Sequence, residues 1–97
     1  MLQRTFRANI TDLVAGSTQK GDSGIAVVVD AGATYEGATL VISFRQKGST
    51  GAFSVLDNTL VAGDQQTYTI GGEVEIGISV TGAGSPAPAI PVFINVI

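Results

Sequence analysis

The stretch Glu73-Val74-Glu75-Ile76-Gly77-Ile78-Ser79-Val80 decides the fold class, because its apolar residues recur at every second position. Successive side chains of a β-strand point to opposite faces, so this strand would have one apolar face and one polar face. A strand of this kind is half-buried, which is typical of an antiparallel sheet that covers a core on one side. The stretch therefore predicts an all-β protein.

The same period of two recurs on both sides of this stretch. Gly71-Gly72 directly precedes it and follows another expected strand, so we expect a tight hairpin turn there, because glycine adopts positive φ at both central positions. Thirteen glycines in 97 residues also oppose long helices. Seven strands are expected in all, at residues 4–10, 25–30, 39–45, 53–57, 66–70, 73–80 and 90–97.

The number and spacing of these strands predict one domain over residues 1–97. Short strands separated by glycine-rich turns favour a single antiparallel β-sandwich or small barrel of about seven strands, Ig-like in architecture. We expect residues 24–97 to form its core and residues 1–23 to add an N-terminal strand or arm. Gly16-Ser17 is interpreted as part of a turn.

The composition argues against several kinds of chemistry. The chain has no cysteine and no histidine, which removes disulfides, thiolate metal sites, and the commonest general base and metal ligand. Its net charge of −3 is opposite in sign to that of a typical nucleic-acid-binding protein. No apolar stretch is long enough for a membrane span, and no secretory signal is visible. We therefore expect no catalytic residues, no cofactor, no metal, no nucleic-acid partner and no membrane contact.

One pair of carboxylates keeps an enzymatic function open. Glu73 and Glu75 share one face of an expected strand, and two carboxyl groups side by side can perform acid–base chemistry in a small hydrolase. A solvated strand face is the simpler interpretation of the same pattern, because no aromatic subsite is evident beside the pair.

A few aromatic residues keep a glycan-binding function open. Tyr35, Tyr68 and Phe53 could form a platform on which a sugar ring stacks, although aromatic residues of a β-sandwich also serve in the core or at its rim. The loop at residues 47–51 would complete such a binding module.

The last expected strand is apolar on both faces, whereas a half-buried strand shows one such face. Either it is a central strand with both faces covered, or its second face meets another subunit. Pro91 at its start indicates an extended segment that leads into the strand. The first face carries Ile90, Val92, Ile94 and Val96, and the second face carries Phe93 and Ile97.

Several glycine-rich segments and alternating strands follow one another in a defined order. The segment Ala31-Gly32-Ala33-Thr34-Tyr35-Glu36-Gly37 precedes the alternating strand at 39–45, the loop at 47–51 and the segment at 53–57, and Tyr68-Thr69-Ile70-Gly71-Gly72 leads into the strand at 73–79. This order resembles small β-sandwich virion proteins encoded among the structural genes of tailed bacteriophages. The resemblance covers residues 24–97. The chain departs from it at Ala52-Phe53, where a tryptophan is common, and in its doubly apolar last strand.

The resemblance implies a non-enzymatic protein of the virion: a capsid decoration (cement) protein, the base of a head fibre, or a tail-associated component. Its partners would be the major capsid protein or other virion proteins, and further copies of itself in a homo-oligomer assembled in the host cytoplasm. A charged fraction of only 13% suits docking through apolar and edge-strand contacts. A glycan- or cell-surface-binding module on a tail or head fibre is the alternative. We expect the contact surface near Phe6, Pro91, Phe93 and Ile97.

Overall fold

The computed structural model describes residues 4–9, 14–30, 39–81 and 91–97, and these residues form eight β-strands and no helix. The expected all-β fold is therefore confirmed. Seven of the strands coincide with the expected ones to within one residue at either end; Ile10 and Ile90 lie outside the described residues. The strands are β1 (Arg4–Asn9), β2 (Gly16–Ser17), β3 (Gly24–Val29), β4 (Thr39–Gln46), β5 (Ser54–Asp57), β6 (Gln65–Thr69), β7 (Val74–Thr81) and β8 (Pro91–Val96).

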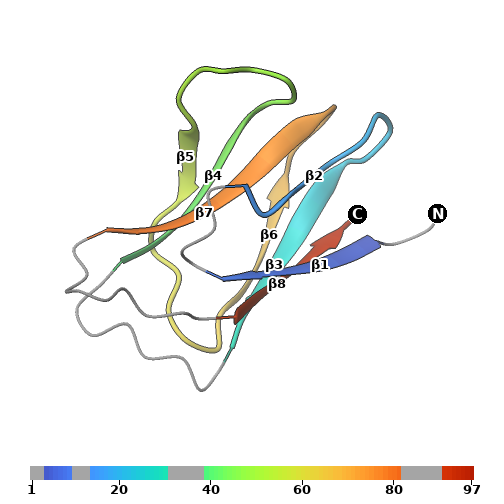
Figure 1. Cartoon of the computed structure of the whole chain (residues 1–97). Helices are drawn as coiled ribbons and strands as arrows, with labels where there is room; N and C mark the ends of the chain where they lie inside the picture. The colour runs from blue at the N-terminus through green and yellow to red at the C-terminus, as the bar shows by residue number, and fades with distance from the viewer. Residues whose placement is uncertain (1–3, 10–13, 31–38, 82–90) are drawn as a thin grey trace.

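The strands form two four-stranded sheets that pack as a sandwich, and every neighbouring pair is antiparallel. Sheet A has the order β1-β8-β3-β6, and sheet B has the order β2-β7-β4-β5. Figure 1 shows the two layers, with β4, β5 and β7 in one and β1, β3 and β8 in the other. The expected antiparallel sandwich is confirmed.

The strand order, which the sequence left open, follows a simple rule. The first strand pairs with the eighth, the second with the seventh, the third with the sixth and the fourth with the fifth. A chain paired in this way is one long hairpin rolled into two sheets, and this is the eight-stranded jelly roll with its two Greek keys. The order differs from that of an immunoglobulin domain, in which the last strand lies in the sheet of strands C and F; here β8 lies between β1 and β3.

The hairpin expected at Gly71-Gly72 is wrong, because the two strands that it joins lie in different sheets. β6 pairs with β3 in sheet A, whereas β7 pairs with β2 and β4 in sheet B. Gly72 has a φ of 83°, but Gly71 is not among the glycines with positive φ. The turn carries the chain from sheet A to sheet B. The alternation of the flanking strands would be the same for a hairpin within one sheet, so the sequence pattern does not distinguish the two arrangements.

The interpretation of Gly16-Ser17 as a turn is also wrong, because these residues form the short strand β2 at the edge of sheet B, opposite Ile76 and Glu75. Glycine is needed at position 16: a Cβ there would overlap the ring of Phe6. Thr18 follows, fully buried, and its hydroxyl donates to the carbonyl of Gly72 at 2.6 Å and accepts from the Val74 N–H at 3.0 Å. This hydroxyl satisfies the backbone where the chain enters β7.

The core lies between the two inner faces, where the residues of each strand alternate as the sequence predicts. Burying one such aliphatic side chain stabilises the fold by about 1.5–3 kcal/mol. The aliphatic residues that are at most 2% exposed are Ile25, Val27 and Val29 from β3, Val92, Ile94 and Val96 from β8, Leu40 and Ile42 from β4, and Ile76 and Ile78 from β7.

The pairing of β3 with β6 makes a stability prediction at Gly24. A Cβ on this residue would overlap the backbone carbonyl oxygen of Tyr68, and the two strands would have to separate there. We expect Gly24→Ala to lower the free energy of unfolding by at least about 2 kcal/mol, as other overpacked sites do. Urea unfolding followed by circular dichroism measures the change.

Gly71→Ala is the matched control, because nothing lies within 4 Å of a Cβ at that position. We expect it to change the free energy of unfolding by no more than about 0.5 kcal/mol. Equal stability of the two variants would contradict the close approach at Gly24.

Candidate functional site

The last strand exposes one aromatic side chain on the outer face of sheet A. β8 is central, with Phe93 directly opposite Arg7 on one side and Val28 on the other. Phe93 is 40% exposed, and the guanidinium of Arg7 lies over its ring, 5.7 Å from the centroid. The strand is therefore central, as one alternative expected, and the described residues leave Phe93 on its second face partly exposed.

Pro91 and Ile97 belong to the same outward-facing series as Phe93 and are both half-buried. Their backbone groups fix the two ends of the strand. The Pro91 carbonyl accepts from the Asp30 N–H at 3.2 Å, and the Ile97 N–H donates to the Gly24 carbonyl at 2.9 Å. They lie at the two margins of the outer face that has Phe93 at its centre.

Phe6 lies on the opposite side of sheet A from Phe93. It pairs with Ile94, whose side chain is fully buried, and it packs against the core beside Gly16. The structure thus does not bring together the four residues expected near the contact surface: Phe93, Pro91 and Ile97 share the outer face, whereas Phe6 contributes to the interior.

The carboxylate of Glu75 holds a loop in place on the outer face of sheet B. Its Oε2 accepts from Arg45 Nε at 2.8 Å, and its Oε1 accepts from the Gly48 N–H at 3.2 Å. The hydrogen bonds from Arg45 and Gly48 hold the pKa of Glu75 below its ordinary value. A carboxylate that is ionised and paired in this way is poorly suited to donate a proton at neutral pH, which is the role a hydrolase would need from one of its two carboxyls.

The same arginine positions Phe53. Arg45 Nη1 donates to the Gly51 carbonyl at 3.0 Å, and the guanidinium lies 4.4 Å from the centroid of the Phe53 ring. A cation over an aromatic face at this distance is attractive. The ion pair with Glu75 and the contact with the ring together place Phe53 over the outer face of sheet B.

Tyr68 does not lie on the outer face with Phe53. It packs against the core, and its hydroxyl donates to Asp57 Oδ2 at 2.5 Å, which joins β6 of sheet A to β5 of sheet B. Tyr35 lies outside the described residues. The described part of the chain therefore does not assemble the aromatic platform expected for a sugar.

A β-bulge between β4 and β5 sets the directions of two side chains. Ile42 pairs with Asp57, whereas the next residue, Ser43, pairs with Val55, so Leu56 is an extra residue on β5. Leu56 packs against the core. Val55 can then point to the outer face while Asp57 reaches Tyr68 between the sheets.

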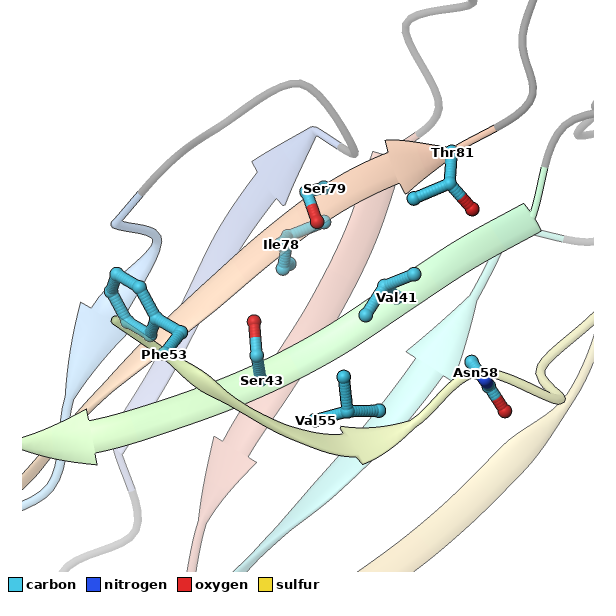
Figure 2. A pocket seen from close by; sticks show the side chains of 8 residues that line it. All are labelled: Val41, Ser43, Phe53, Val55, Asn58, Ile78, Ser79 and Thr81. Carbon is cyan, nitrogen blue, oxygen red and sulfur yellow. The ribbon is translucent and has the colours of Figure 1, made fainter.

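A hollow of about 440 Å³ opens on the outer face of sheet B, which is within the range of roughly 300–1,000 Å³ common for small-molecule sites. Val41 and Ser43 from the central strand β4 are only 8% and 7% exposed at its floor (Figure 2). The sequence pattern did not predict this site. The lining residues are Val41, Ser43, Phe53, Val55, Asn58, Ile78, Ser79 and Thr81.

The hydroxyl of Ser43 has no hydrogen-bond partner among the described residues. Thr18, the other buried polar side chain of the described residues, makes two such bonds. The Ser43 hydroxyl lines the hollow, so a molecule that enters the hollow can reach it. Figure 2 shows the Ser43 hydroxyl directed toward β7 and the Ser79 hydroxyl directed toward β4, so the two polar groups flank the same space.

Within the described ranges, no group of three or more acidic residues lies close enough to hold a metal ion. Asp57 and Asp64 instead accept local hydrogen bonds, from Thr59 and from the Val61 N–H.

No helix in the described part of the chain is long and apolar enough to cross a membrane.

Comparison of the chain with protein-family models, with curated proteins and with solved structures finds no match.

The hydrogen bond from Tyr68 to Asp57, which joins the two sheets, can be tested by substitution. Tyr68→Phe removes the hydroxyl and leaves the ring in place, so we expect the free energy of unfolding at pH 7 to fall by about 1–2 kcal/mol. Chemical unfolding of both proteins measures the difference. Thr59→Ala, which removes the other side-chain hydrogen bond to Asp57, tests whether the carboxylate needs both donors.

The effect of Tyr68→Phe should depend on pH. Burial raises the pKa of Asp57, but the hydrogen bonds from Thr59 and Tyr68 outweigh it, so the pKa lies below its ordinary value. A carboxyl with a lowered pKa stabilises the fold above its unfolded pKa, and this stabilisation is lost as the pH falls through the folded value. The difference between the two proteins should therefore shrink below about pH 4; a constant difference from pH 7 to pH 3 would contradict the role of the ionised Asp57.

Proposed function

We propose that this protein is a non-enzymatic structural component of a bacteriophage virion, assembled in the host cytoplasm, that decorates or cements the capsid as a symmetric oligomer. The observation that carries the proposal is the outer face of sheet A, on which Phe93 lies exposed at the centre of three paired strands. This face is the docking surface of the proposal, and its occupant is a neighbouring virion protein.

The charge of this face supports a protein partner with a neutral surface. Arg7 is the only charged residue among the outward positions of the four strands of sheet A, and it lies against Phe93. Around these two residues are short neutral side chains, among them Thr5, which donates to Asn95 Oδ1 at 2.6 Å. A face with so little charge loses little solvation of charge when a partner covers it.

The fold is consistent with the proposal by analogy only. Jelly rolls occur in viral capsid proteins, but also in lectins and cupins, so the topology alone does not select a function. The resemblance of residues 24–97 to phage virion proteins favours the first of these groups. Repeated copies on a lattice would add avidity to a modest contact at each site.

Replacing Phe93 tests the docking surface. Burying a phenylalanine side chain contributes about 1.5–3 kcal/mol, so Phe93→Asp should reduce the number of copies bound per purified particle by about tenfold or more. The copy number, measured by mass spectrometry relative to the major capsid protein, gives the result. Sedimentation of the isolated protein shows whether its oligomer depends on the same residue.

Two further variants make the result specific. Phe93→Thr removes the ring but keeps a residue suited to a strand, and it should also lower occupancy. Val14→Asp places the same charge at a residue that is 49% exposed and lies beside β2 of sheet B, and it should leave occupancy unchanged. Full occupancy by folded Phe93→Asp and Phe93→Thr proteins would refute this choice of surface.

A further inference from the structure

The hollow on the outer face of sheet B contains a polar group that the fold does not use. Ser43 is 7% exposed, its side chain lines the hollow, and no described residue bonds to its hydroxyl. Valine would fit a strand at this position at least as well and would carry no polar group to satisfy. The hydroxyl is therefore available to a partner that enters the hollow from outside.

The rest of the lining indicates the chemistry of that partner. Ser79 and Thr81 on β7 add two hydroxyls, and Asn58, just after β5, adds an amide that both donates and accepts. Phe53 and Val55 supply apolar surface beside these groups. The described residues that line the hollow carry no charge, so they match neither an anion nor a cation.

We propose that this hollow binds a neutral saccharide, with Ser43 as its buried hydrogen-bonding group. A pyranose ring has hydroxyls around its edge and C–H groups on its faces. Its edge therefore suits the hydroxyls of Ser43 and Ser79, and its faces suit an aromatic ring and valine side chains. Figure 2 shows Ser43 and Ser79 with Phe53 and Val55 around one space, whereas the side chain of Ile78 belongs to the core on the inner side of the sheet.

Arg45 and Glu75 have a positioning role at this site. They lie outside the lining of the hollow, and their ion pair holds the loop that carries Phe53. The saccharide site is independent of the docking surface proposed for sheet A, because the two outer faces lie on opposite sides of the sandwich. A particle-bound copy could thus present the hollow outward.

Titration of the ¹⁵N-labelled protein with maltose, lactose, cellobiose and N,N′-diacetylchitobiose tests the proposal. We expect at least one of these disaccharides to shift the backbone amide signals of Ser43, Asn58 and Ser79 in a saturable manner, with a Kd on the order of 1 mM. The amide signals of Phe93 and Thr67 on sheet A should not move. If none of the four sugars shifts the signals at the hollow up to about ten times that concentration, the proposal is overturned.

Variants at the hollow identify the contact. Ser43→Val should weaken binding of the same sugar at least about tenfold, and it should keep or raise the unfolding midpoint in urea, because it removes an unmatched hydroxyl. Ser79→Ala, at a less buried position, should weaken binding about threefold or more. Thr67→Val is the control on sheet A and should bind like the wild type. Wild-type affinity in folded Ser43→Val and Ser79→Ala proteins would refute the site.

Discussion

The insertion of β8 between β1 and β3 is the constraint on which the rest of the structure depends. This strand makes sheet A continuous and brings residues from both ends of the chain together, as in the hydrogen bond between Thr5 and Asn95. Contacts between such distant residues form only after much of the intervening chain is ordered, so their entropic cost is met late in folding. The buried faces of Val92, Ile94 and Val96 offset that cost.

The register of β8 also decides which of its two apolar faces reaches solvent. Both neighbours pair with it so that Phe93 points away from sheet B, and a slip of one residue would exchange Phe93 with its buried neighbours. The alternate positions on the inner side carry only valine and isoleucine, which fit the space between the sheets. The exposed ring is thus a consequence of the pairing that closes the fold.

The sequence predicted individual strands well because alternation is a local property of each segment. It did not predict which strands pair, since Gly71-Gly72 serves a crossing between sheets as readily as a hairpin. It missed β2, which has two residues and is defined by its partner rather than by its own pattern. The one local sign of the hollow was Val41, an apolar residue on the otherwise polar side of its strand. The remaining lining residues come from or near β5 and β7, which flank β4 in sheet B. The order of the strands along the chain does not reveal these pairings.

The two outer faces of the sandwich differ in shape and polarity because different side chains and loops lie on each of them. On sheet A, Phe93 is exposed among mostly neutral side chains, with Arg7 over its ring, and such a surface suits a protein contact. On sheet B, the loop held by Arg45 and Glu75 and the bulge at Leu56 raise Phe53 and Val55 beside the small residues of β4 and β7. That arrangement forms a hollow, and it buries Ser43 without giving its hydroxyl a partner among the described residues. The Ser43 hydroxyl bonds to no described residue and lies at the floor of that space, so it is the polar group of this face best placed to contact a molecule that enters from outside.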